Sequence, residues 1–136
     1  MSNIRAGRTL PIQDSMTEPF WRGAKDRRLM MPLSPETGEI SWPPYRNCLV
    51  EGNYSPKWVE VSGTGTVYTF SIIYRSSHVK PPAPYVLAIV LLTEGVYMTT
   101  NIVNVDPNKV RIGMPVKVAF EDLESDLRLP VFTPVD

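Results

Sequence analysis

Proline placement constrains the fold of this chain more than any other feature of its sequence. The 136 residues include 14 prolines, about twice the ~5 % typical of proteins. They gather in the first half and in one later loop, at Pro32, Pro35, Pro43, Pro44, Pro56, Pro81, Pro82 and Pro84. Because proline lacks an amide hydrogen and fixes φ, these stretches are excluded from helices and from central strands. Regular structure is therefore expected mainly between them.

The second half of the chain predicts a β-barrel. Five stretches have the alternation or the β-branched and aromatic content of strands, at residues 66–75, 85–93, 96–103, 115–120 and 128–135. Glu94-Gly95 predicts a hairpin turn between the second and third, and Asp106 can cap a short helical turn before the fourth. This pattern predicts an OB-fold, a five-stranded Greek-key barrel, with an open sandwich of the same strands as the alternative.

One of these stretches differs from the others in composition. Residues 85–93 are apolar almost without interruption. Strands buried on both faces have such continuous runs, whereas half-exposed strands alternate. We therefore expect this strand in a buried position.

The first half of the chain predicts a short helix and small extended pieces. We expect a flexible arm at 1–15 and a helix over 16–26, where Ser15 and Glu18 have the spacing of a capping box. Residues 29–31 and 39–42 predict a small hairpin around the turn-prone residues 34–38. The predicted organisation is a 1–15 arm, a helix and hairpin region at 16–56 and a barrel at 57–136, all in one compact unit.

Charge and cysteine content exclude several classes of protein. Fourteen basic residues balance fourteen acidic ones, whereas proteins that bind nucleic acid usually carry a basic excess. Cys48 is the only cysteine, which rules out an internal disulfide and fits a reducing cytosol. The N-terminus lacks the apolar core of a signal peptide, and no apolar run is long enough to cross a bilayer. We expect a cytoplasmic protein that contacts neither nucleic acid nor membrane.

The sequence offers no catalytic constellation. Cys48 and His78 are the sole thiol and imidazole, and the neighbours of Cys48 give no sign of an activated thiolate. His78 lies in a proline-rich loop, where it is either solvated or in contact with a ligand or partner. Phosphate loops, dinucleotide fingerprints and nucleophile elbows are absent from the sequence. We expect no catalytic residue and no cofactor.

An ordered set of short segments resembles a known family. The chain is similar to the acyl-coenzyme-A-associated OB-fold family, long catalogued as a domain of unknown function, over about residues 18–121. The segments that carry the resemblance are Pro19-Phe20-Trp21, Leu29, Trp42-Pro43-Pro44 and residues 58–70, 84–88 and 111–116. The resemblance implies an N-terminal helix, a rubredoxin-like zinc ribbon and an OB barrel.

The chain departs from the family pattern at the zinc ribbon. The resemblance places the four ligand positions, each a cysteine in the family, at Ser34, Thr37, Cys48 and Glu51. Hydroxyl groups are poor zinc ligands, and structural zinc sites are built from cysteine and histidine. We therefore expect a degenerate ribbon that holds no metal.

The resemblance also implies a partner. Family members accompany thiolase-like enzymes, including thiolases, acyltransferases and aldolases of lipid metabolism, or hydratases that act on acyl-CoA. It implies a non-catalytic accessory subunit that stabilises such a partner and shapes its CoA entrance. Aromatic anchors are common in interfaces, and the expected interface residues are Phe20, Trp21, Trp42, Tyr45 and His78.

Two other functions stay open. A stand-alone acyl-CoA-binding protein needs cations for the CoA diphosphate, and the one dense basic group comprises Arg22, Lys25, Arg27 and Arg28. The simpler reading of that group is a solvated helix face. Binding of single-stranded nucleic acid is the third reading, because OB-folds can do so, and the neutral charge speaks against it.

Overall fold

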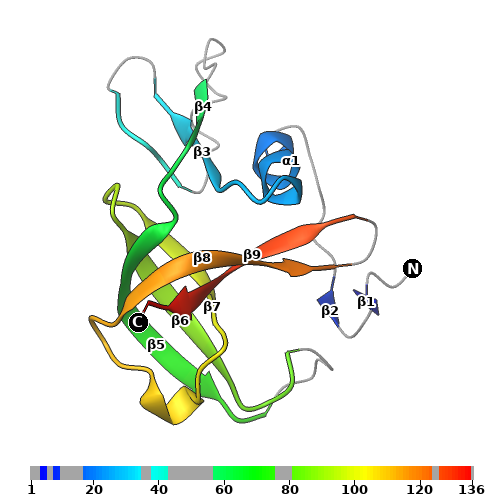
Figure 1. The fold of residues 1–136 in the computed structure, drawn as a ribbon, viewed down its shortest axis with the longest axis vertical. Coiled ribbons are helices and arrows are strands. Elements are labelled where there is room, and N and C mark those ends of the chain that lie inside the picture. The colour runs from blue at the N-terminus through cyan, green and yellow to red at the C-terminus, as the bar shows by residue number, and fades with distance from the viewer. Residues whose placement is uncertain are drawn as a thin grey trace.

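A closed β-barrel forms the larger part of the molecule. The structure is a computed structural model, and it describes residues 4–5, 8–9, 17–34, 38–42, 57–75, 81–123 and 126–135. The barrel strands follow the order β5-β6-β7-β9-β8 and close between β8 and β5 (Figure 1). Their bounds are β5 Thr64–Ile73, β6 Tyr85–Leu92, β7 Tyr97–Ile102, β8 Pro115–Asp122 and β9 Arg128–Pro134. The predicted five-stranded barrel is confirmed, and the open sandwich is wrong.

Local turn chemistry sets the barrel connections. Gly95 adopts φ +89° in the β6–β7 turn, where Leu92 N donates to Val96 O at 2.8 Å. The 3₁₀ helix η1, Pro107–Lys109, follows Asp106, whose carboxylate accepts from Asn108 N at 2.9 Å. Both the hairpin turn and the Asp106 cap agree with the sequence prediction.

Strand pairing is uneven around the barrel. β5 pairs with β6 through an irregular register at Tyr68, between Val67 and Thr69. β7 meets β9 in parallel at a single residue pair, Ile102 and Phe132. Since β7 and β9 share so little of their length, one stretch of the barrel wall lacks a continuous hydrogen-bonded ladder.

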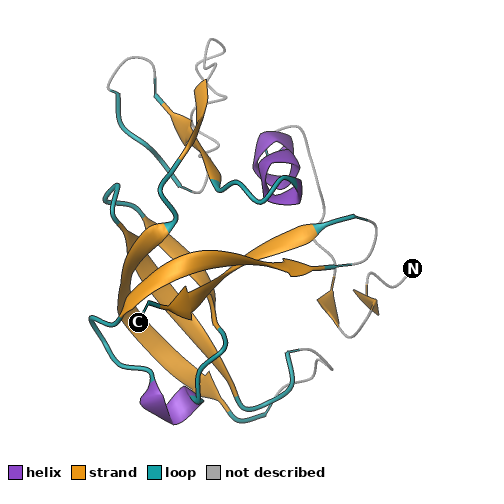
Figure 2. Ribbon diagram, in the orientation of Figure 1, coloured by secondary structure: helices purple, strands orange, loops and turns teal. Residues whose placement is uncertain are grey.

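The helix and two small sheets lie outside the barrel (Figure 2). Helix α1 is Glu18–Lys25, β3 is Met30–Leu33 and β4 is Lys57–Glu60; β1, Ile4–Arg5, pairs with β2, Arg8–Thr9. The N-cap of α1 is Thr17, whose side chain makes no capping hydrogen bond. The expected capping box is therefore wrong, because the helix begins at Glu18 and Ser15 lies two residues before the cap, outside the described residues.

The strand partner in this region also differs from the expectation. β3 pairs along its length with β4, from Met30 opposite Glu60 to Leu33 opposite Lys57. The expected hairpin with residues 39–42 is reduced to one bridge between Leu33 and Ile40. The strand at residues 57–60, which opens the predicted barrel segment, thus belongs to a separate sheet. Long-range pairing of this kind leaves no local signal in the sequence.

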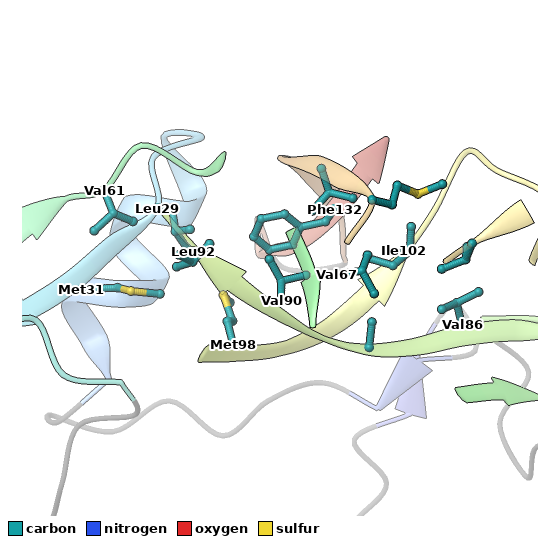
Figure 3. Packing of buried hydrophobic residues seen from close by; sticks show 14 of the residues in the cluster. Leu29, Met31, Val61, Val67, Val86, Val90, Leu92, Met98, Ile102 and Phe132 are labelled. Carbon is teal, nitrogen blue, oxygen red and sulfur yellow. The ribbon is translucent and has the colours of Figure 1, made fainter. Parts of the chain in front are cut away.

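The buried core is continuous from the barrel into the helix region. Val67, Val90 and Phe132 fill the barrel centre, and Leu29, Met31 and Val61 continue the same cluster toward α1 (Figure 3). β6 is buried on one face only, because Val86, Ala88, Val90 and Leu92 point inward while Leu87 is 43 % exposed. The inward face of β6 therefore has the buried position that the sequence predicts, and the outward face does not.

None of the described helices has the length and apolarity needed to span a lipid bilayer.

Candidate functional site

An apolar cleft lies where α1 and Trp42 meet the barrel wall. Its volume is about 300 Å³, at the lower end of the range for ligand or anchor pockets. The residues that line it come from both regions: Phe20, Trp21, Trp42, Leu87, Met98, Thr99, Thr100, Asn101, Leu129 and Pro130. We call it the aromatic cleft. It lies along β7 and β9, which share a single paired position.

Three aromatic rings form one wall of the cleft. Phe20 lies 4.9 Å from Trp21 in an edge-to-face arrangement and 4.6 Å from Trp42 in a tilted one, both measured between ring centroids. Such pairs are favourable beyond the area that they bury. Phe20 is only 4 % exposed, whereas Trp21 and Trp42 are partly buried. The buried ring therefore supports the other two, which present surface to the cleft.

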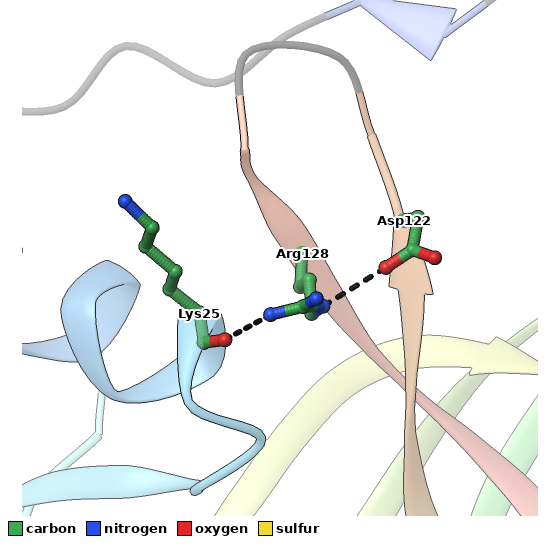
Figure 4. A network of polar contacts seen from close by, with 3 residues as sticks. All are labelled: Lys25, Asp122 and Arg128. Atoms are coloured by element: carbon green, nitrogen blue, oxygen red, sulfur yellow. Dashed lines mark hydrogen bonds and ion pairs between the residues drawn. The ribbon is translucent and has the colours of Figure 1, made fainter.

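Helix α1, which carries Phe20 and Trp21, is fixed at its C-terminal end by Arg128. The guanidinium donates through Nη1 to the backbone carbonyl of Lys25 and through Nε to Asp122 Oδ1, 2.9 Å away (Figure 4). Gly23 faces β3, and a Cβ at this position would collide with Met30 Cγ. The glycine that weakens the helix in isolation thus permits its close packing on β3.

The cations beside the cleft divide into paired and free side chains. Arg22 lies 3.2 Å from the Glu18 carboxylate, and Arg28 lies 3.0 Å from that of Glu60. Within the described part of the chain, the side chains of Lys25 and Arg27 have no ionic partner. Of the four predicted CoA-binding candidates, these two have charges that are not already neutralised.

Two polar side chains that line the cleft already form hydrogen bonds within the chain. Asn101 Nδ2 donates to Val86 O at 2.9 Å, and Thr100 Oγ1 donates to Pro130 O at 3.4 Å. None of the lining residues carries a titratable side chain. The cleft can therefore hold an apolar group, and the residues that line it include no titratable group that could act as an acid or base or activate the Thr99 and Thr100 hydroxyls.

The structure brings together three of the five expected interface residues. Phe20, Trp21 and Trp42 share the cleft wall, while Tyr45 and His78 lie outside the described residues. The cleft residues from β6, β7 and β9 were not expected. The sequence around Leu87 is continuously apolar and gives no signal for its outward position, and the nearness of Leu129 and Pro130 depends on the β7–β9 contact.

The four residues at the positions that the family resemblance assigns to zinc ligands do not suit the metal. Thr37, Cys48 and Glu51 lie outside the described residues, and Ser34 stands at the end of β3. There Ser34 N donates to Glu39 O and Ser34 O accepts from Gly38 N, at 2.9 and 2.8 Å. Backbone hydrogen bonds thus close this turn. A donor set of two hydroxyls, one thiol and one carboxylate does not match a structural zinc site, and we derive no role for zinc.

Sequence and structure comparisons relate the chain to several proteins. Residues 58–121 match the family model described as the ChsH2 C-terminal OB-fold domain. A DUF35 domain-containing scaffold protein of Methanocaldococcus jannaschii is 32 % identical over 122 residues, covering 85 % of this chain and 84 % of that protein. A solved structure described as "Ltp2-ChsH2(DUF35) aldolase" has a TM-score of 0.82 and 34 % identity, covering 92 % of this chain and 98 % of that chain.

A longer relative matches over only part of its length. The probable enoyl-CoA hydratase alpha subunit of Thermomonospora curvata is 38 % identical over 116 residues. The match covers 85 % of this chain and 36 % of that subunit. This chain therefore corresponds to about a third of that relative.

Proposed function

This chain belongs to the DUF35 family, and from that premise we propose that it is a non-catalytic accessory subunit of a thiolase-like acyl-CoA-processing enzyme. In this role it binds and stabilises the partner and helps to shape the entrance for the CoA ester. The aromatic cleft is the single observation that carries the proposal. It offers partly buried tryptophans, and none of the residues that line it carries a titratable side chain.

The composition of the cleft suits a protein partner. Tryptophan is the residue type most enriched at the energetic centres of interfaces, where its truncation can cost about 2 kcal/mol or more. Trp21 and Trp42 are held by the buried Phe20 ring, so they lose little side-chain freedom on binding. The names of the relatives, a scaffold protein, an aldolase and a hydratase subunit, support an acyl-CoA enzyme as the partner.

Purification of the untagged native protein with its bound partner tests the proposal. We expect a thiolase-fold enzyme to co-purify, and its turnover of acyl-CoA to fall when this chain is removed and to recover when it is added back. Recovery of the chain alone, or of an unrelated protein, would refute the accessory role.

The cleft itself is tested by truncating its rings. We expect Trp21→Ala to weaken binding to the purified partner about 30-fold while thermal stability changes little. Phe20→Ala is expected to lower stability first, because Phe20 is buried. Tyr74→Ala provides the control, since Tyr74 is 68 % exposed and does not line the cleft. If Trp21→Ala and Phe20→Ala both lose stability and bind the partner unchanged, α1 only plugs the barrel.

A stand-alone acyl-CoA-binding protein is the second candidate. The free charges of Lys25 and Arg27 favour it, because a CoA diphosphate needs cations that are not already paired. Calorimetric titration of the isolated chain with coenzyme A separates the two functions. Micromolar binding that is lost in the Lys25→Ala/Arg27→Ala variant would favour the stand-alone role, and no heat of binding would favour the accessory role.

A further inference from the structure

Three neighbouring strands of the barrel contain no charged residue. β5 has 10 residues, β6 has 8 and β7 has 6, and none of them is Asp, Glu, Lys or Arg. In the whole chain 21 % of residues are charged. The side chains that point into the core explain half of this absence, because cores exclude charge. The absence of charge from the side chains that point outward needs another explanation.

The strand registers define the outward side chains in three rows across the sheet. From β5 through β6 to β7, the rows are Ser71–Leu87–Asn101, Thr69–Ile89–Thr99 and Thr66–Leu91–Tyr97. These residues, together with Tyr68, form what we call the neutral face, on strands that lie side by side in the barrel wall (Figure 1). The strands β8 and β9, in contrast, contain charged residues, among them Lys117, Asp122 and Arg128.

An irregularity in β5 adds a second tyrosine to this face. Tyr68 is the extra residue between Val67 and Thr69 in the pairing with β6, and both Tyr68 and Thr69 are exposed. A bulge of this kind can re-aim a side chain. The Tyr68 ring lies 4.9 Å from that of Tyr97, and the two side chains are 53 % and 49 % exposed. The neutral face therefore displays tyrosine, leucine and hydroxyl groups together.

We propose that the neutral face is a second part of the partner-binding surface, and that its occupant is an uncharged, largely apolar patch of the same thiolase-like enzyme. This inference rests on the proposed function. The centres of protein interfaces are depleted of charge and enriched in aromatic residues. A charged group of the partner that was buried here would find no counter-ion and would lose its hydration. The partner surface that covers the neutral face must therefore be uncharged as well.

Area and continuity favour one occupant that covers both surfaces. Three strands about 4.8 Å apart and about 26 Å long present roughly 400 Å², whereas a stable interface buries about 800 Å² on each partner. The neutral face alone is too small for a stable dimer of this chain. It is continuous with the aromatic cleft, however, because Leu87, Thr99 and Asn101 belong to both. Together they form one continuous uncharged surface on the outside of the barrel, larger than either part alone.

Charge insertion at Ser71 tests the proposal. Ser71 is exposed and does not line the cleft, so Ser71→Lys and Ser71→Asp should fold normally and leave the cleft intact. We expect each to weaken binding to the co-purified enzyme at least tenfold, whichever the sign of the charge. Ser71→Thr keeps a neutral hydroxyl and should bind within twofold of wild type. Asn108→Lys, an exposed control on η1 outside the neutral face, should also bind within twofold.

The outcomes distinguish this inference from the proposed function. If the thiolase-like enzyme binds the wild-type chain and both charged variants equally well, the neutral face is not an interface and the accessory role stands. If one charge weakens binding and the other strengthens it, the partner patch is charged and the inference is wrong. It is also wrong if Ser71→Lys converts a dimer of the isolated chain into a monomer, as measured by sedimentation. If no such enzyme co-purifies, both proposals fall.

Discussion

At the scale of single residues, Arg128 joins two segments that lie 103 positions apart in the chain. Its guanidinium binds the last carbonyl of α1 and the Asp122 carboxylate. We expect Arg128→Leu to lower the free energy of unfolding by about 1–2 kcal/mol, because a hydrogen bond from a charged donor is lost at a helix end. Urea denaturation of the isolated chain measures this loss.

The matched variant is Asp122→Asn, which removes the ion pair and leaves the bond to Lys25. Asp122 is largely exposed, and exposed ion pairs contribute little. We expect a loss within about 0.5 kcal/mol. If Arg128→Leu and Asp122→Asn lower the free energy of unfolding equally, the hydrogen bond from Arg128 to the Lys25 carbonyl contributes nothing to stability.

Four residues decide the metal content. The family resemblance assigns zinc ligands to these positions, and because Ser34, Thr37 and Glu51 rather than cysteines occupy three of them, we expect the purified protein to hold no stoichiometric zinc. We also expect its thermal stability to be the same with and without a chelator. Elemental analysis and a melting curve in EDTA check this. About one tightly held zinc per chain would contradict the prediction.

At the scale of elements, the packing of α1 on β3 depends on Gly23. Alanine favours an isolated helix by about 1 kcal/mol over glycine, but its Cβ here would collide with Met30 Cγ and lie 3.0 Å from Arg28 O. Overpacking typically costs about 1–3 kcal/mol. We therefore expect Gly23→Ala to destabilise the protein by about 1 kcal/mol, as measured by urea denaturation.

A double-mutant cycle identifies the cause of that loss. In a Met30→Ala background the colliding atom is absent, so Gly23→Ala should cost less there than in the wild type. The same cost in both backgrounds would place the effect in the backbone rather than in this contact.

The elements also show what the sequence could and could not predict. Residues of the five barrel strands, the Gly95 turn and the Asp106 cap could be identified because each depends on local patterning. The partner of β3 could not, since β4 lies more than twenty residues away and no pattern encodes that pairing. The exposure of the outward face of β6 could not be predicted either, because its outward residues are as apolar as its inward ones.

The candidate site also combines residues that could be predicted from the sequence with residues that could not. Phe20 and Trp21 could be named from the sequence because adjacent aromatics on a short helix cannot both face one core, and Trp42 because it belongs to a segment that carries the family resemblance. Leu129 and Pro130, at the opposite wall, could not be named because their place depends on how β9 crosses β7. Lys25 and Arg27 could be listed as cations, but only the pairing of Arg22 and Arg28 shows which charges are free.

At the scale of the whole molecule, the accessory role predicts that chemistry belongs to the partner. We expect Cys48→Ala and His78→Ala to fold and to leave turnover of the reconstituted complex within tenfold, about 1.4 kcal/mol in barrier height. Steady-state kinetics of the complex, with circular dichroism of each variant, measure this. A thousandfold loss with folding intact would reveal a catalytic residue in this chain.

The cleft is built from both ends of the described chain, and this order matters during synthesis. Phe20 and Trp21 leave the ribosome about 110 residues before Leu129 and Pro130, which is on the order of ten seconds at typical translation rates. An eight-residue helix is too short to persist alone in water. Both rings therefore remain without part of their packing surface, Leu129 and Pro130, until β9 has emerged. The yield of folded chain in a cell is then set by what meets Phe20 and Trp21 in that interval, a chaperone, another nascent chain or the finished partner enzyme.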